Sequence, residues 1–367
     1  IIVFGDKEGE NITLLDEIRN RFNLQVLVVD SANYLDCKDA NEILQKYGAE
    51  QVRKCIKDAI QVPVKNVEFL KNTKQINIYE TEKLRIGISK IDSFLYGGLP
   101  FGGVTNIIGK TGEGKSTLAS QIIAQALNQG YKVFIYSGEL SNSSYKEGMV
   151  RQLAGSHVTA YQDDSVWHNV HYNVPDHIVE KIDNWYDRKC LIYNDSIWDD
   201  EEESLLQTLE NTIQQYETRV ILIGNLMTAL DLEPNNGGDR YEKQSLFVKK
   251  VARLAVKYNV LILMVAHKRK DSLGDENDQI MGSSDIGNLS MVTLSYGRDK
   301  DIRDDQRLLK ISKNRLFGKI NTAGWILDYD EKSKRIYGRD DDVNFEYDWN
   351  IENGFITEIS EEEDVPF

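Results

Sequence analysis

The chain has 367 residues, of which 41% are hydrophobic and 28% charged, and its formal net charge is −15. This length and composition are those of a globular protein with one large domain or two smaller ones. They exclude a Pro-rich linker protein, since only 5 prolines occur. The sequence contains no apolar run of about 18 residues, so it predicts no membrane span. The 3 cysteines form no C-x-x-C pair, so we expect neither a disulfide framework nor a zinc site, and a reducing, cytoplasmic compartment fits.

Residues 1–60 predict a small α/β unit. Apolar runs predict strands at 1–5 and 24–30, and amphipathic patterns predict helices at 11–22, 39–47 and 49–60. Residues 61–84 lose this alternation and predict a linker with a helix at 64–72. Because residue 1 already lies inside an expected strand, we expect the unit to be part of a longer chain.

Residues 85–339 predict a larger α/β domain. Short apolar runs predict strands at 104–108, 133–137, 220–223, 260–265, 308–311 and 324–329, with helices at 116–129, 205–216 and 241–258. The first four strands are apolar at nearly every position, which is typical of a parallel sheet buried on both faces. The fold class is therefore α/β with a mostly parallel sheet.

Residues 109–116, GKTGEGKS, match G-x-x-x-x-G-K-[ST] at every fixed position, between an expected strand and an expected helix. In such a loop, backbone N–H groups surround phosphate oxygens and the helix N-terminus adds its positive dipole end. Lys115 is expected on the β- and γ-phosphates and Ser116 on Mg²⁺. The expected nucleotide contacts are Gly109, Lys110, Thr111, Gly112, Glu113, Gly114, Lys115, Ser116 and Thr117. The sequence thus predicts binding of ATP or another NTP or dNTP.

Two polar residues at expected strand ends are candidates for the hydrolytic step. Glu139 follows the strand at 133–137, at the edge where parallel sheets bind ligands, and is the candidate general base that orients the attacking water. His267 ends the strand at 260–265 and is the candidate sensor of the γ-phosphate.

The strand between these two lacks the acid that usually follows it and supports Mg²⁺. Gly224 stands there, followed by Asn225, and no carboxylate occurs before Asp231. Three interpretations stay open. Ser116 and waters hold Mg²⁺ alone, or Glu139 or Asp231 substitutes, or hydrolysis is weak.

Six short motifs follow one another along residues 85–330. They are Gly-Leu-Pro at 98–100, the phosphate loop at 109–116, Ser-Gly-Glu at 137–139, Ala-His at 266–267, Gly-Ser-Ser-Asp-Ile at 282–286 and Lys-Asn-Arg at 313–315. The ordered set resembles the RecA-like motor of hexameric replicative helicases of the phage primase-helicase and Twinkle type. The resemblance implies a ring of six or seven copies that hydrolyses NTP between subunits and moves along single-stranded DNA.

The resemblance also assigns roles outside the phosphate loop. Arg315 would be an arginine finger for the γ-phosphate held by the neighbouring subunit, with Lys313 as its companion. Tyr329 falls near the place where the family stacks the nucleotide base. Channel loops at 227–240 and 268–284 would contact DNA phosphates through the cations Arg240, Lys268, Arg269 and Lys270.

The N-terminal unit is similar to the last half of a TOPRIM domain, a fold that holds Mg²⁺ on a strand-end acidic pair. Asp6 and Glu8 stand where that pair is expected, and Lys-Asp-Ala-Asn-Glu at 38–42 matches a later segment. Because the first strand of that fold, with its own glutamate, lies outside this sequence, we interpret the unit as a remnant that does not make primers.

Residues 340–367 predict an acidic tail, with eleven Asp and Glu and no Lys or Arg, which leaves a net charge of about −4 for the rest. The tail ends in Val-Pro-Phe and is similar to the C-terminal tips of single-stranded-DNA-binding proteins and phage primase-helicases. Phe367 and its carboxylate then predict docking on a replication protein such as a DNA polymerase. A solubilising tail is the alternative.

The sequence therefore predicts an NTP-driven, ring-shaped DNA helicase. A RecA- or KaiC-like NTPase that is not a helicase is the second hypothesis. A nucleotide-binding adaptor ring with little hydrolysis is the third, and Gly224 is the residue that motivates it.

Overall fold

The computed structural model describes residues 2–8, 11–12, 26–61, 67–163, 168–194, 203–233, 239–268, 282 and 284–350. The chain divides into two compact units, Ile1–Ile76 and Asn77–Phe367, each with a core of its own. Within the described ranges, every helix is too short or too polar to span a bilayer.

The first unit combines a short sheet with one long helix. The sheet has the order β1 (Ile2–Val3), β4 (Leu27–Val28), β5 (Ile60–Gln61), and β1 and β4 are parallel. Helix α2 (Ala40–Lys57) begins at Asp39, whose carboxylate accepts from the backbone N–H of Glu42 at 2.7 Å. The helices predicted at 39–47 and 49–60 are one element, kinked at Gly48. The core of the first unit consists of Val29, Tyr34, Cys37, Ile43 and Cys55.

Two helix predictions in this unit differ from the structure. Residues 11–12, the start of the helix predicted at 11–22, form β3 (Asn11–Ile12), which pairs with β2 (Lys7–Glu8); the remainder lies outside the described residues. Of the helix predicted at 64–72, residues 67–69 are not helical and residues 70–72 form a single 3₁₀ turn, η2 (Leu70–Asn72), while residues 64–66 lie outside the described residues. Phe69 and Leu70 are 78% and 85% exposed, and a short helix that buries no apolar face is marginal in water.

The second unit is built around one large sheet, as predicted. Its order is β12 (Cys190–Ile192), β9 (Val133–Tyr136), β13 (Val220–Ile223), β14 (Leu261–His267), β8 (Gly103–Gly109), β15 (Val292–Gly297), β16 (Arg307–Asn314), β17 (Asn321–Asp330), β18 (Arg335–Tyr337). The strands from β12 to β15 run parallel, and β16, β17 and β18 extend the sheet antiparallel. The mostly parallel α/β fold is thereby confirmed.

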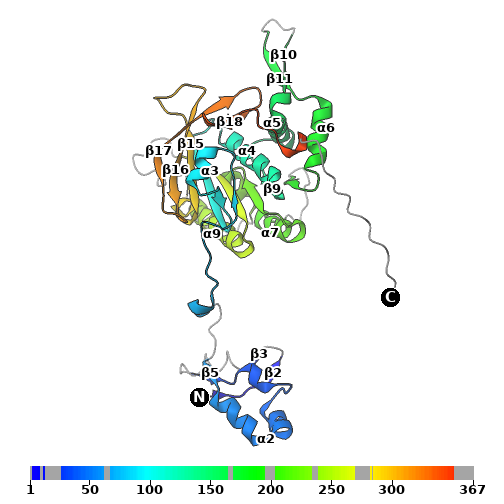
Figure 1. Ribbon diagram of the computed structural model, residues 1–367, viewed down its shortest axis with the longest axis vertical. Helices are drawn as coiled ribbons and strands as arrows, with labels where there is room; N and C mark the ends of the chain where they lie inside the picture. The colour runs from blue at the N-terminus through cyan, green and yellow to red at the C-terminus, as the bar shows by residue number, and fades with distance from the viewer. Residues whose placement is uncertain are drawn as a thin grey trace, which may run out of the picture. The chain divides into compact units, whose positions relative to one another are not determined.

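Helices cover both faces of this sheet (Figure 1). One face packs on α3 (Ser89–Phe94), α4 (Lys115–Asn128), α5 (Asn142–Ala154) and α6 (Asp176–Trp185), and the other on α7 (Leu205–Tyr216), α8 (Leu226–Ala229), α9 (Arg240–Tyr258) and α10 (Ser284–Leu289). Strand β13 shows why its sequence is continuously apolar. Val220 and Leu222 belong to the first core, and Ile221 and Ile223 to the second.

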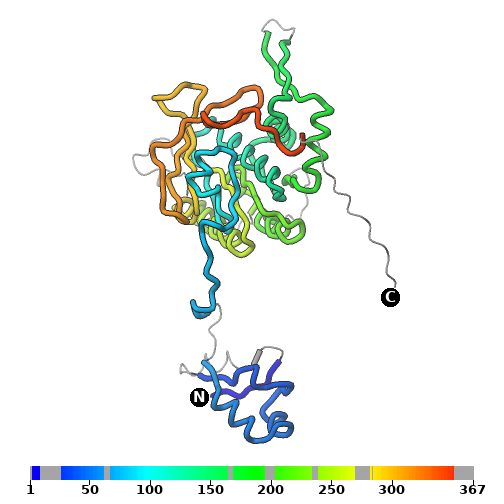
Figure 2. Tube along the Cα trace, viewed as in Figure 1, coloured from blue at the N-terminus to red at the C-terminus, as the bar shows by residue number. Residues whose placement is uncertain are grey.

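A hairpin that the sequence did not predict extends from the second unit. Strands β10 (Thr159–Gln162) and β11 (Val170–Asn173) pair antiparallel between α5 and α6 and project from the body (Figure 2). Nearly all their residues are exposed on both faces, so the hairpin has no hydrophobic period for sequence analysis to detect.

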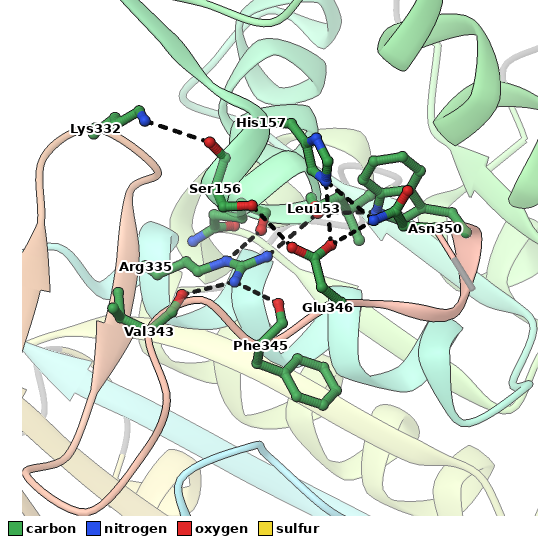
Figure 3. A network of polar contacts seen from close by, with 11 residues as sticks. Leu153, Ser156, His157, Lys332, Arg335, Val343, Phe345, Glu346 and Asn350 are labelled. Carbon is green, nitrogen blue, oxygen red and sulfur yellow. Dashed lines mark hydrogen bonds and ion pairs between the residues drawn. The ribbon is translucent and has the colours of Figure 1, made fainter. Parts of the chain in front are cut away.

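Residues 340–350, which the charge pattern assigns to the acidic tail, pack onto the body. Tyr347 and Trp349 are 2% and 8% exposed, and the indole of Trp349 donates to the carbonyl of Leu153 at 2.9 Å. The buried guanidinium of Arg335 donates to two carbonyls of this segment (Figure 3). The folded body therefore continues to residue 350, because its aromatic residues have a surface to bury. Residues 351–367, including Phe367, lie outside the described residues.

Candidate active site

The phosphate loop joins the end of β8 to the start of α4. Gly114 precedes α4 at φ 90° and ψ 19°, a left-handed conformation that strains residues with a side chain. Lys115 is 4% exposed, and its ammonium donates to the carbonyl of Lys110 at 2.6 Å. Burial lowers the pKa of Lys115, while the carboxylates of Glu113 and Glu139 act in the opposite direction. A buried ammonium whose other donors have no partner in the described residues is suited to an anion.

Glu113 ties this loop to its own sheet. Its carboxylate accepts from the backbone N–H of Lys110 at 2.7 Å, and its carbonyl accepts from the guanidinium of Arg307 at 3.1 Å. The side chain is therefore used to close the loop, and Arg307, at the start of β16, is a supporting residue that the sequence analysis missed.

The candidate base and the candidate sensor lie together beside the loop. Nε2 of His267 is 3.2 Å from Oε1 of Glu139, and Nδ1 is 3.4 Å from the hydroxyl of Thr111. The side chain of Glu139 is 43% exposed and that of His267 18%, so water can reach the carboxylate. This geometry brings together three predicted residues, from the segment after β9, from β14 and from the phosphate loop.

A fourth residue in this group was missed. The amide of Asn225 donates to Oε1 of Glu139 at 2.5 Å. Asn225 directly follows Gly224 at the end of β13, so the signal available in the sequence was a polar residue at the same sheet edge as Glu139 and His267. Asp231 lies farther on, in η4 (Leu230–Leu232), and is exposed.

The predicted cations Lys313, on β16, and Arg315, directly after it, lie at the opposite end of that strand from the loop. The ammonium of Lys313 donates to the carbonyls of Gly287 and, at 2.9 Å, Asn288, and the guanidinium of Arg315 also donates to Asn288. Burial and the nearby Arg315 lower the pKa of Lys313 to about 8. Neither side chain has a carboxylate partner in the described part of the chain.

The other predicted contacts are distributed differently. Ser116 and Thr117 line a pocket of about 80 Å³ together with Tyr145 and Gln152, two residues the sequence analysis did not select. Tyr329 lies on β17, is 37% exposed and pairs with β18 in the sheet register, and burial raises its pKa.

The predicted DNA contacts are only partly described. Arg240 is exposed at the start of α9. The ammonium of Lys268 bonds to the hydroxyl of Ser295 at 2.6 Å and its backbone N–H to the carbonyl of Gly109 at 3.0 Å, so this residue lies beside the phosphate loop. Arg269 and Lys270 lie outside the described residues.

In the first unit, Asp6 and Glu8 are both exposed. Among the described residues, no group of three or more side chains is arranged to hold a metal ion. The structure therefore adds no partner to this acidic pair within the described ranges.

Solved structures share the fold. The chain matches a solved ATPase domain with a TM-score of 0.55 and 14% identity, over 70% of this chain and 91% of that one. It matches a DnaB-like replicative helicase with a TM-score of 0.55 and 12% identity, over 81% of this chain and 73% of that one. At such identities the likeness shows a RecA-like fold.

Sequence comparisons identify the family. No curated relative matches the chain. A family model described as "ATPase: KaiC" matches residues 84–319, well over half of the chain, and this stretch contains the phosphate loop, Glu139, His267 and Arg315. The chain therefore belongs to the KaiC-type ATPase family and is a nucleotide-binding NTP hydrolase with a RecA-like fold.

Proposed function

We propose that the protein is a ring-forming, NTP-driven helicase that moves along single-stranded DNA. The single observation that carries the ring is the course of β16. Arg307 at its start contacts the phosphate loop of the same chain, whereas Arg315 directly follows its last residue. At about 3.3 Å per residue, Arg315 lies roughly 25 Å from Arg307. This separation supports the proposal that Arg315 acts on a γ-phosphate bound by a neighbouring copy.

The arrangement at the loop supports hydrolysis at that interface. Lys115 and Ser116 hold the nucleotide, Glu139 orients the water, and His267 links the base to the loop through Thr111. Arg315 and Lys313 supply positive charge from the neighbour, where it stabilises the transition state. Each of these roles is part of the proposal.

The residues fit a nucleotide better than they fit a fully coordinated Mg²⁺. The glycine-rich loop and the buried ammonium of Lys115 suit phosphates. For Mg²⁺, Ser116 is the ligand at the helix start and Glu139 is the nearby carboxylate, while Gly224 offers no side chain. Mg²⁺ would offset the phosphate charge and orient the γ-phosphate.

Coupling of NTP hydrolysis to DNA binding is supported by the position of His267, the proposed γ-phosphate sensor, directly before the proposed channel loop at 268–284. Lys268 directly follows His267 and contacts Gly109 and Ser295. A change at the γ-phosphate would therefore act at the first residue of the 268–284 segment. Arg240, Lys268, Arg269 and Lys270 are the proposed phosphate contacts. Binding of this kind is independent of base sequence, as a translocating motor needs.

The ends of the chain complete the proposal. The first unit, with Asp6 and Glu8, is a TOPRIM-like remnant, and the linker that follows joins it to the motor. The tail that ends in Phe367 docks on a replication protein such as a polymerase, because an acidic segment is steered to a basic groove.

Two other functions have a specific observation in their favour. The family match favours a KaiC-like NTPase ring without unwinding activity. Gly224 favours an adaptor ring that binds nucleotide and barely hydrolyses it.

The test is Mg²⁺-dependent hydrolysis of each NTP, with and without single-stranded DNA, followed by strand displacement on a forked duplex. We expect hydrolysis that DNA stimulates at least severalfold, and unwinding, both lost in Lys115→Ala. Hydrolysis without DNA stimulation or unwinding would favour the KaiC-like alternative. Nucleotide binding without hydrolysis above the Lys115→Ala level would favour the adaptor.

A further inference from the structure

The end of β13 lies very close to β9. The backbone N–H of Gly224 donates to the carbonyl of Tyr136 at 2.6 Å, and a Cβ placed on Gly224 would lie 2.5 Å from that oxygen. Because the contact is with backbone, it cannot be relieved by a side-chain rotation. A side chain at 224 therefore requires the two strands to separate, and the missing acid cannot be restored there without that movement.

The next residue, Asn225, uses both polar ends of its side chain. It is 6% exposed. Its Oδ1 accepts from the backbone N–H of Met227 at 2.8 Å, which caps α8, and its Nδ2 donates to Oε1 of Glu139 at 2.5 Å. The first contact stabilises a local turn. The second joins β13 to the candidate base, 86 residues away in the sequence.

We propose that Asn225 is a positioning residue that fixes the carboxylate of Glu139 for hydrolysis. This inference rests on the proposed NTP hydrolysis. Both described partners of Glu139, Asn225 and His267, bond to Oε1. Oε2 has no hydrogen-bond partner among the described residues and is therefore the oxygen that accepts from the attacking water. A half-exposed carboxylate held at one oxygen keeps the other at a fixed place, and such orientation contributes strongly to rate.

An amide suits this position better than an acid. Aspartate at 225 would have the same shape and would still cap α8. It has no hydrogen to donate when ionised, and it would place a second negative charge against Oε1 of Glu139. Serine would also cap α8, but its hydroxyl is too short to replace the amide. Substitution can therefore separate the local cap from the contact with Glu139.

The experiment measures kcat, KM, ADP affinity and melting temperature for Asn225→Ser, Asn225→Asp and Glu139→Gln. Asn142→Ser is the matched control, because the amide of Asn142 donates to the carbonyl of Tyr193 at 2.9 Å and does not contact Glu139. We expect Asn225→Ser and Asn225→Asp to lower kcat about 10- to 100-fold, with KM and ADP affinity within about twofold of the parent. The melting temperatures of Asn225→Ser and Glu139→Gln should stay close to that of the parent, whereas Asn225→Asp should melt lower, because it places an unpaired carboxylate in a buried position beside Glu139. Asn142→Ser should keep its kcat.

A double variant distinguishes positioning from a structural role. If Asn225 acts through Glu139, then Asn225→Ser in a Glu139→Gln background should lower kcat no further. A further loss equal to that in the parent would show that Asn225 acts elsewhere and would overturn the proposal.

The remaining outcomes separate the inference from the function beneath it. If Glu139→Gln lowers kcat strongly and Asn225→Ser retains the parent's kcat, the positioning role is wrong and the proposed function stands. A gain of turnover in Asn225→Asp would mean that the position lacks a metal-supporting acid, which also overturns the inference. If the parent does not hydrolyse NTP above Lys115→Ala, both proposals fall.

Discussion

The two ends of β16 differ in what surrounds their cations. At Arg307 the strand meets its own phosphate loop, and the guanidinium is satisfied by carbonyls of the same chain, including that of Glu113. At Lys313 and Arg315 the donors meet the last carbonyls of α10, with no carboxylate partner in the described residues. The first end completes a site within one chain. At the second end, the positive charge is not neutralised by any carboxylate among the residues that the structure describes.

A cluster of aromatic rings holds the second end in place. Phe317, two residues after Arg315, lies with ring centroids 5.5 Å from Tyr79 and 4.7 Å from Tyr96. Tyr79 and Tyr96 are themselves 5.1 Å apart. Aromatic pairs of this kind contribute about 0.5–1.5 kcal/mol each beyond burial. The turn that contains Arg315 is therefore held in place by ring contacts within the chain.

The largest expected effect is that of Arg315→Ala. We expect kcat to fall about 10³-fold with ADP affinity unchanged, because an arginine supplied in trans acts on the transition state. Mixing Arg315→Ala chains with Lys115→Ala chains should restore part of the activity, since mixed interfaces combine an intact loop with an intact arginine. Steady-state hydrolysis of the mixture checks this. If the mixture is no more active than its components, the two ends of β16 do not work on neighbouring copies.

A smaller effect is expected on the pH dependence of kcat/KM, through Lys313 at the same end of β16. Lys313, with its pKa lowered to about 8, is charged below that pH and becomes neutral above it. If its charge acts on the nucleotide of the neighbour, kcat/KM should fall severalfold as pH rises from 7 to 9. Lys313→Arg keeps the charge over this range and should remove the fall. Identical pH profiles for the parent and Lys313→Arg would show that Lys313 has no such role.

The smallest effect is expected for the aromatic cluster. Tyr79→Leu removes the ring contacts with Phe317 and Tyr96, so the arginine-bearing turn should be less well ordered. We expect kcat to fall about two- to fivefold with ADP affinity unchanged, in keeping with a loss of about 1 kcal/mol. Tyr161→Leu, at a 56% exposed tyrosine on the β10–β11 hairpin, is the control. Equal effects of the two substitutions would argue against ordering of the turn by this cluster.

Much of the fold could be predicted from local sequence patterns. Helix α7 (Leu205–Tyr216) and strand β13 (Val220–Ile223) have the predicted bounds, because their apolar spacing matches a helix and a doubly buried strand. The structures of the predicted linker helix and of the start of the tail could not be predicted in this way. Whether these segments form a helix or pack onto the body depends on whether Phe69 and Trp349 find a surface that buries them. The local sequence contains no information about such a surface.

The candidate site divides in the same way. By itself, the sequence determined the phosphate loop, because eight consecutive residues contain the glycines, Lys115 and Ser116 that such a loop needs. Only the tertiary structure brought Glu139 to Asn225 and His267, which are 86 and 128 residues away in the sequence, and brought His267 to Thr111, 156 residues away. The order of the strands in the sheet decides such contacts. The close pairing of β9 with β13 also leaves room only for glycine at position 224. A local pattern fixes the period of a strand, whereas its neighbours are chosen by packing of the whole sheet.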